Sequence, residues 1–455
     1  MKRLFLTVPF LCLAAMLLLS ACNDPGYVGT PPTSDGKTPL PPVSESPMQE
    51  TAEPTPGPSL PNEDLTYVLE VDSYTVTGIG GYKGEDLVIP SFYRGKPVTA
   101  IGEKAFTENS DIKSVTIGES VKSIGNFAFY ECTGLESVTI PSGVTALGSF
   151  AFSGCTKLSV LTVPDSVTSI GHGTFSRCGG LTEVILGGGI AQMEEGVFQD
   201  CISLARVTIS DGVQVIGKAM FENCTALEGV VIPDSVLDIK DEAFVGCSAL
   251  SSVVIGNSVT SIGANTFDGC VGLTEAVIPS GVKSIGESAF KGCAGLAVLS
   301  IGESVEEIGP SAFQGCSKLT AVQIPDSVNY ISSYTFADCT SLESVDVGNG
   351  VTSVGERAFS MCAALKNVRI GTSVKSIRSH AFYQCMEMKS LIIPQSVTQI
   401  EGYALTLTGL TDVWCEAYVQ PNGWDPYNWK NEHPITTAHF AGSWEYVDGV
   451  PTPIS

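Results

Sequence analysis

Histidine and basic side chains are scarce in this chain of 455 residues. It has four histidines, and its 24 Lys and Arg residues stand against 48 Asp and Glu, which gives a net charge of −24 at pH 7. Nucleic acid would repel such a chain, and an anionic lipid surface would not attract it. The composition therefore excludes functions that depend on a basic surface.

Motifs that carry chemistry are also missing. None of the histidines has a Ser, a Cys or a carboxylate at a spacing typical of a nucleophilic or metal site; they are His172, His380, His433 and His439. The glycines follow a regular register rather than a dinucleotide- or phosphate-binding pattern. We therefore expect a non-catalytic protein with no metal site and no cofactor.

Long apolar runs are absent except at the N-terminus. A basic pair precedes the run from Leu4 to Leu19, as in a secretory signal. This run is shorter than the about 20 residues that a membrane-spanning helix needs. It ends in LSAC, residues 19–22, which resembles the lipobox of bacterial lipoproteins. The resemblance implies a signal peptide over residues 1–21 and a lipidated Cys22 as the only membrane anchor; an ordinary signal with an incidental Cys is the alternative.

The next segment, residues 22–62, is rich in Pro, Ser, Thr and Gly and has almost nothing to bury. Such a composition is typical of a disordered, partly polyproline chain. We expect a tether that holds the rest of the protein away from the membrane.

Most of the remaining chain repeats every twenty-three residues. Phe recurs at this interval from position 106 to position 382, and Cys from position 132 to position 385. One unit reads C-x-x-L-x-x-V-x-I-P-x-S-V-x-x-I-G-x-x-A-F-x-G. A period of this length is the signature of a repeat architecture.

Each unit contains one strand signal and one short turn signal. The segment Leu135–Ile140 alternates toward its end, so Thr139 is predicted to face outward, and Pro141 ends the strand because it cannot donate to a ladder. The following GSFAF predicts a helical or 3₁₀ turn that buries Ala151 and Phe152. One unit cannot bury these faces alone, so the units are predicted to stack with parallel strands about 4.8 Å apart.

The repeat resembles the BspA-like leucine-rich repeats of bacterial surface proteins, over about Leu87 to Leu410. The resemblance implies an α/β repeat solenoid: a right-handed leucine-rich-repeat solenoid of about 14 coils, with a parallel β-sheet on one face and short helical or 3₁₀ turns on the other. Residues 63–89 are expected to form a hairpin-like N-terminal cap, residues 90–411 the repeats, and residues 412–455 an aromatic C-terminal cap or flank.

The recurrent cysteines have three possible roles. Equivalent residues in stacked coils lie within disulfide range, but their side chains point the same way, whereas a disulfide needs a dihedral angle of about 90°. Zinc needs four convergent ligands, and each unit offers one Cys. We therefore expect buried free thiols whose S–H groups reach backbone carbonyls. Disulfides, which an exported protein permits, stay the alternative.

Other recurrent polar residues are expected to be structural. Asp165, Asp234 and Asp326 follow proline at one position of the unit. Calcium would need them stacked, but Asp165 and Asp234 are three units apart, so we predict turn formation. His172 and His380 fall in the predicted helical turns, where we expect them to be exposed and without a role.

The outward strand positions form the column in which binding is best sought. A Thr-rich start gives way to an apolar and then a polar zone, and the candidate ligand-binding residues are Val231, Val254, Val277, Gln323, Asp346 and Arg369. Exposed apolar patches with polar rims mark interaction sites, although β-branched residues favour strands even when exposed. Neither this column nor the parallel one two residues earlier contains an aromatic residue, which favours a protein ligand over a glycan.

The resemblance also implies a role. Relatives of this repeat family are associated with adhesion, which implies an exported, lipid-anchored protein at the bacterial surface that binds a protein of host cells, the matrix or other bacteria. The alternative is a structural component of the cell envelope that binds cell-wall polymers. An enzyme is the third possibility, and only the Trp-rich C-terminal segment would be a place to look for its site.

Overall fold

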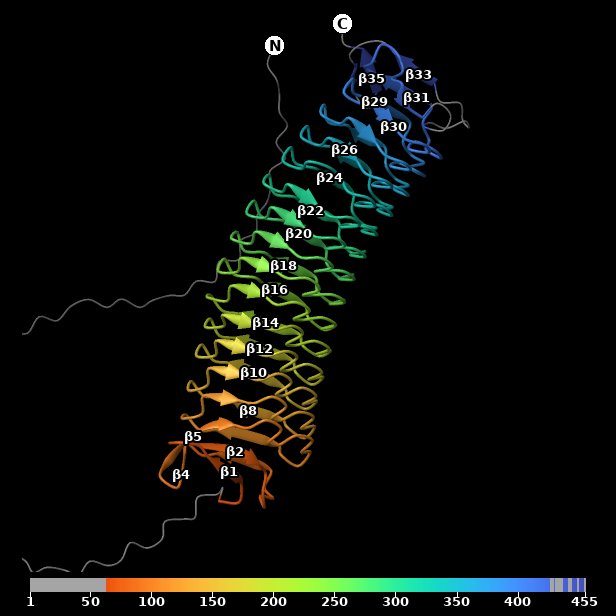
Figure 1. Ribbon diagram of the computed structural model, residues 1–455. Helices are drawn as coiled ribbons and strands as arrows, with labels where there is room; N and C mark the ends of the chain where they lie inside the picture. The colour runs from red at the N-terminus through yellow and green to blue at the C-terminus, as the bar shows by residue number, and fades with distance from the viewer. Residues whose placement is uncertain (1–62, 426–428, 430–436, 441–443, 448–449, 454–455) are drawn as a thin grey trace, which may run out of the picture. The chain divides into compact units, whose positions relative to one another are not determined.

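The computed structural model of the protein describes residues 63–425, 429, 437–440, 444–447 and 450–453. These residues form a parallel-strand solenoid of about 16 turns, called coils below (Figure 1). The expected stack of parallel strands is thus confirmed, whereas the expected number of about 14 coils is too low. The signal peptide, Cys22 and the tether lie outside the described residues.

Each coil contributes one strand to a first column. The strands are β3 (Asp86–Ile89), β6 (Ser114–Ile117), β8 (Ser137–Thr139), β10 (Val160–Val163), β12 (Glu183–Leu186), β14 (Arg206–Ile209), β16 (Gly229–Val231), β18 (Ser252–Val254), β20 (Glu275–Val277), β22 (Val298–Ser300), β24 (Ala321–Gln323), β25 (Ser344–Asp346), β27 (Asn367–Arg369), β29 (Ser390–Ile393), β31 (Asp412–Cys415) and β33 (Thr437–Phe440). The ladder is interrupted between β8 and β10, β18 and β20, β22 and β24, and β27 and β29.

A second column of shorter strands follows the turn that ends each first-column strand, which contains Pro in some coils and Gly in others. It consists of β5 (Lys96–Ile101), β7 (Ser123–Ile124), β9 (Ala146–Leu147), β11 (Ser169–Ile170), β13 (Gln192–Met193), β15 (Val215–Ile216), β17 (Asp238–Ile239), β19 (Ser261–Ile262), β21 (Ser284–Ile285), β23 (Glu307–Ile308), β26 (Ser353–Val354), β28 (Ser376–Ile377), β30 (Gln399–Ile400) and β32 (Gly423–Trp424). Ile331 joins this column through single bridges. The sequence analysis did not foresee this column.

Both flanks join the stack, which explains the additional coils. At the start, β1 (Thr66–Leu69) and β2 (Tyr74–Gly78) are antiparallel, and β2 pairs in parallel with β5. The hairpin partner of β5 is β4 (Phe92–Tyr93). At the end, β31 pairs in parallel with β29 and with β33. An antiparallel pair follows, β34 (Trp444–Val447) and β35 (Val450–Pro453).

The expected helical face is wrong: the described residues contain no helix. After each second-column strand the chain makes successive turns. Their backbone N–H groups alternate between two kinds of acceptor: a carbonyl three residues back in the same coil and a carbonyl of the next coil. In one coil, the N–H groups of Ala105 and Thr107 donate three residues back. Between them, Phe106 N–H donates to Ala128 of the next coil at 2.8 Å. Because every second N–H leaves its own coil, a continuous 3₁₀ ladder cannot form.

Two backbone positions in each coil adopt the left-handed conformation. They lie two residues before and two residues after the recurrent Phe, as at Lys104 and Glu108 around Phe106, where φ is +58° at both. At the later position, several coils have Gly, for example Gly269 and Gly315. Gly avoids the steric cost of positive φ, so this preference was a readable sequence signal for a turn rather than a helix.

The core runs through the whole stack. The recurrent phenylalanines from Phe106 to Phe382 are buried, and their rings stack on one another with centroids 5.0 Å apart at the closest and 5.6 Å apart between Phe198 and Phe221. Buried Leu, Val and Ile of both strand columns surround this stack. Each coil therefore buries its apolar faces mainly against its two neighbours.

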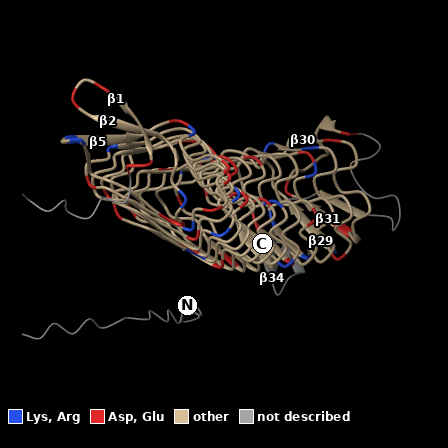
Figure 2. Cartoon of the chain, turned by 90° about the horizontal axis from the view of Figure 1, so that it is seen from below, with Lys and Arg blue, Asp and Glu red and all other residues tan. Residues whose placement is uncertain are grey.

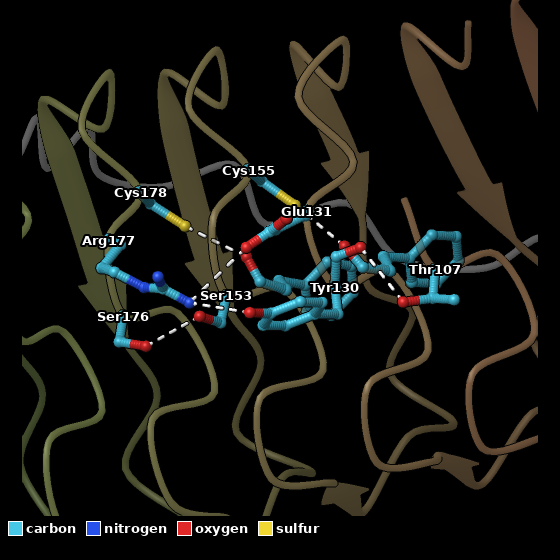
Figure 3. A network of polar contacts seen from close by, with 10 residues as sticks. Thr107, Tyr130, Glu131, Ser153, Cys155, Ser176, Arg177 and Cys178 are labelled. Carbon is cyan, nitrogen blue, oxygen red and sulfur yellow. Dashed lines mark hydrogen bonds and ion pairs between the residues drawn. The ribbon is translucent and has the colours of Figure 1, made fainter. Parts of the chain in front are cut away.

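The cysteines are buried in this core as free thiols, which confirms the prediction of packing. Each recurrent Cys donates its S–H to the carbonyl of the Phe in the preceding coil. Cys155 reaches Phe129 O at 3.3 Å, and Cys178 reaches Phe152 O at 3.2 Å (Figure 3). The thiols thus satisfy backbone acceptors between coils.

Candidate functional site

The candidate surface is the outward face of the first strand column. Val231, Val254 and Val277 are 61%, 57% and 50% exposed, respectively. Parallel pairing sets Val231 directly beside Val254. Val254 and Val277 both line a depression of about 490 Å³, although the strand ladder is broken between β18 and β20. We call these three residues the valine stripe.

The predicted polar zone lies farther along the same face. Gln323, Asp346 and Arg369 are in register across β24, β25 and β27, and Arg369 forms an ion pair with Asp346. All three line a groove of about 580 Å³, whose apolar walls include Leu299 and Val322. The groove opens beside the break between β22 and β24.

The structure therefore separates the six candidate residues into two neighbouring sites. The coil of β22 joins the valine stripe to the groove: its Leu299 lines the groove, and its Val298 is 53% exposed. Sequence analysis did not select Val298 because it lies in the parallel column, two residues before the outward position. Its apolar side chain extends the exposed surface toward the groove.

Charged residues do not gather on one part of the solenoid; acidic and basic side chains are dispersed along the coils (Figure 2). Several of them pair between neighbouring coils, as Arg206 does with Glu183 at 3.0 Å and Lys283 with Glu306 at 3.3 Å. Exposed pairs of this kind contribute little to stability. Beside the valine stripe, the exposed Glu275 of β20 lines the same depression as Val254 and Val277.

The recurrent aspartates have a structural role that differs in detail from the prediction. Asp165, Asp234 and Asp326 accept backbone N–H groups of the next coil, with Oδ1 at 2.8 Å from Gly188 N in the first case and at 2.6 Å from Asn257 N in the second. They therefore join coils rather than close their own turns. Within the described residues, no three His, Cys, Asp or Glu side chains are grouped as metal ligands would be.

The histidines of the turns are half-buried rather than exposed, which corrects the expectation. His172 packs its edge against Phe150, and His380 stacks on Tyr403 with ring centroids 5.1 Å apart. His439 contacts Asp412 at 2.8 Å, which lowers the pKa of that carboxyl group. His433 lies outside the described residues.

The turn face also carries polar and aromatic contacts between coils. Arg177 donates to the Tyr130 hydroxyl at 3.0 Å and approaches Glu131 at 3.8 Å (Figure 3). Beneath them, the Ser176 and Ser153 hydroxyls are 2.9 Å apart. Tyr130 lies on the turn face, outside the two strand columns whose lack of aromatic residues favoured a protein ligand.

The cysteines are poor candidates for chemistry. Burial raises the pKa of the Cys132, Cys247 and Cys293 thiols to about 12. Because the thiolate is the nucleophilic form, such thiols are unreactive near neutral pH. In the part of the chain that the structure describes, no helix is long and apolar enough to cross a bilayer.

These features define a class: a repeat solenoid with a buried Phe and Cys core and a long exposed strand face. The family model described as "BspA type Leucine rich repeat region (6 copies)" matches residues 99–228, 215–343 and 306–421. The chain therefore belongs to the BspA-type leucine-rich repeat proteins. No curated protein matches the sequence.

The chain is also similar to solved structures. A leucine-rich repeat protein from Bacteroides ovatus is 27% identical, with a TM-score of 0.70, over 83% of this chain and 98% of that chain. A leucine rich cell surface protein from Faecalibacterium prausnitzii is 29% identical over 72% of this chain and 96% of its own, with a TM-score of 0.42. A T. pallidum leucine rich repeat protein is 30% identical over 47% of this chain and 90% of its own, with a TM-score of 0.38.

Proposed function

We propose that this protein is a non-catalytic adhesin of the bacterial surface, which binds a protein partner through the valine stripe. The observation that carries the proposal is three adjacent coils with an exposed Val at the same position, each at least half exposed. Family membership supports the class of role, since leucine-rich repeat proteins generally mediate protein–protein interaction.

The polar groove would form the edge of this interface. Interfaces combine a desolvated apolar centre with a polar rim that fixes orientation. The Asp346–Arg369 pair is half exposed and can exchange its partners for groups of a ligand without leaving a buried charge. Gln323 adds an amide donor and acceptor on the side of the groove nearer to the stripe.

Display at the surface is the second part of the proposal. It rests on the signal-like run over residues 1–21, on Cys22 in its lipobox-like setting and on the Pro-rich segment that follows. The F. prausnitzii protein of similar sequence is described as a cell surface protein. Host-cell, matrix and bacterial surface proteins are the partners to test first.

The experiment replaces the valine stripe by charge. The triple variant Val231→Glu, Val254→Glu, Val277→Glu should lose at least about tenfold in affinity for immobilised fibronectin or fibrinogen, because three carboxylates would have to be desolvated at the interface. The matched control adds the same charge on the same face, as Thr139→Glu, Thr162→Glu, Thr208→Glu, all at exposed strand positions. It should bind as the unaltered chain does.

Purified peptidoglycan is included as a further immobilised ligand, with circular dichroism as the check on folding. Binding that falls equally in both triple variants would contradict the placement on the stripe. Binding to peptidoglycan alone would contradict the adhesin and support the envelope role.

A further inference from the structure

A second surface of interest lies on the turn face near the C-terminal end. It is built on the left-handed position two residues before the core Phe, or before Leu405 in the last of these coils. In the middle of the array this position has small or polar residues, such as Gly196, Asn265 and Ser288. Large side chains stand at this position near both ends of the array: Lys104, Phe127 and Phe150 in the first coils. Near the C-terminal end, four consecutive coils have Tyr334, Arg357, His380 and Tyr403, with φ between +54° and +64°. We call these four residues the aromatic column.

Large side chains at these left-handed positions cost backbone energy, and the packing of the core does not need them. A residue with a Cβ loses about 1–2 kcal/mol in the left-handed conformation, and Gly or Asn avoids most of it. The core beneath is filled by Phe336 and Phe359, which are fully buried. Tyr403, by contrast, remains 46% exposed. The left-handed conformation itself is structural, because every coil adopts it at this position.

The aromatic column borders a concave site. A depression of about 300 Å³ is lined by Tyr334, Arg357 and His380 of the column, and also by Asp338 and Tyr383. This volume is at the lower end of the range for small-ligand pockets, which are mostly apolar and aromatic with a few placed polar groups. It suits a ligand of one or two rings rather than a folded protein surface.

The lining side chains are held in place before a ligand arrives. Arg357 donates to the Tyr334 hydroxyl at 2.8 Å and lies 5.6 Å from the centre of its ring. His380 stacks on Tyr403 at 5.1 Å and meets Tyr383 edge-on at 5.3 Å. Pre-ordered groups reduce the entropy lost on binding.

The charges of the site favour an uncharged ligand. Arg357 and Asp338 have opposite charges, and burial, with the Arg357 charge as a smaller cause, lowers the pKa of His380. The imidazole is therefore neutral at pH 7, and the Arg357 charge is offset by carboxylates, Asp338 in the lining and Glu356 near His380. A cationic ligand would also find the Tyr334 ring already occupied by Arg357.

We propose that this depression binds a neutral saccharide, with sugar C–H faces on the rings of His380 and Tyr383 and hydroxyl groups hydrogen-bonded to Arg357 and Asp338. A saccharide combines flat apolar faces with uncharged donors and acceptors, which is what the lining offers. The site is separate from the valine stripe and its proposed protein partner, so either proposal can fail alone.

The test measures binding of the full chain to cellotriose, maltotriose and N,N′,N″-triacetylchitotriose by titration calorimetry. The double variant His380→Asn, Tyr403→Asn should weaken binding of the preferred trisaccharide at least tenfold. Its melting temperature should stay unchanged or rise, because Asn tolerates positive φ. Glu242→Asn is the matched control at the same position of a central coil, with φ of +63°, and should bind normally.

Asp338→Asn is the second variant, since it keeps the side-chain shape, and Asn also suits the φ of +62° there. It should weaken binding several-fold with the fold intact, by removing a hydroxyl acceptor. Absence of binding to all three trisaccharides overturns the proposal. So does full binding by the double variant, or a loss of binding that Glu242→Asn shares.

Discussion

At the scale of the residue, the twenty-three-residue interval of Cys has a specific cause. Each thiol fills the space beside the Phe stack and donates to the Phe carbonyl one coil earlier, as Cys247 does to Phe221 O at 3.1 Å. The same carbonyl also accepts the backbone N–H of Cys224 at 3.1 Å, so Ala at position 247 would remove one of its two donors and the volume of the sulfur. The thiol therefore contributes mainly to packing and adds a second hydrogen bond to that carbonyl.

Burial of so many thiols predicts a protein that loses stability at alkaline pH. The thiols of Cys132, Cys247 and Cys339 have a pKa raised to about 12 from an ordinary value of 9.0. In the unfolded chain they ionise at the ordinary value, so the folded state holds more protons above it. Their stabilisation is complete below about pH 9 and is lost as pH rises toward about pH 12.

The free energy of unfolding should therefore fall by about 1.4 kcal/mol per pH unit for each such thiol in this interval. Urea denaturation followed by tryptophan fluorescence at about pH 8 and about pH 10 measures it. Cys247→Ala should be less stable at the lower pH but show a shallower decline. A denaturation midpoint that does not move between the two pH values would contradict the prediction.

At the scale of the element, the turn face is ordered by bonds between coils. Alternate N–H groups reach the next coil, and this requires a left-handed residue on each side of the Phe. The coils meet the requirement with different residues: Gly269 and Gly315 in two of them, but Met361 and Gln384 in others. The fold therefore tolerates non-Gly residues here at a cost in backbone energy.

Gly269→Ala should lower the free energy of unfolding by about 1 kcal/mol, from backbone conformation alone. Its φ is +74°, and an added Cβ would approach nothing closer than 3.8 Å. Gly179→Ala is the control, because its space is as open, with the nearest atom at 3.9 Å, and its φ is not positive. Thermal denaturation of both variants and of the unaltered chain gives the change in the free energy of unfolding that each substitution causes. Equal changes in the two would show that the left-handed conformation is not what makes Gly favourable.

At the scale of the whole molecule, contacts are almost entirely between neighbouring coils, from the Phe stack to the ion pairs that join Lys113 to Glu85 and Lys366 to Glu343. The free energy of unfolding of such an array is close to a sum of the stabilities of the single coils and of the interfaces between neighbouring coils. A binding surface can therefore change in a few coils while the rest of the stack is kept. The valine stripe and the aromatic column use this freedom on different faces.

The proposed anchor acts at this same scale, because it decides where the solenoid is displayed. Cys22→Ser should release the protein from the membrane fraction into the medium or the soluble envelope fraction, since a thiol is needed to accept the lipid. Fractionation and immunoblotting of producing cells measure the release, and Cys415→Ser is a control outside the signal. Retention of Cys22→Ser on the membrane would contradict lipid anchoring.

The sequence by itself determined the parallel stack, its period and the burial of Phe and Cys. These follow from nearest-neighbour packing, which is repeated in every unit and can therefore be read from one unit. The outward position of Val231, Val254 and Val277 follows for the same reason, because a strand alternates its side chains between two faces.

Only the tertiary structure decided the rest. In a single unit, a turn whose N–H groups donate three residues back cannot be told from a 3₁₀ helix. The remaining N–H groups donate to carbonyls twenty-two residues later, in the next coil, and only the folded stack brings these together. The breaks between strands, and the groove beside one of them, depend on how coils are offset. The aromatic column depends on the left-handed turn, which brings Tyr334, Arg357, His380 and Tyr403 side by side at one position of consecutive coils.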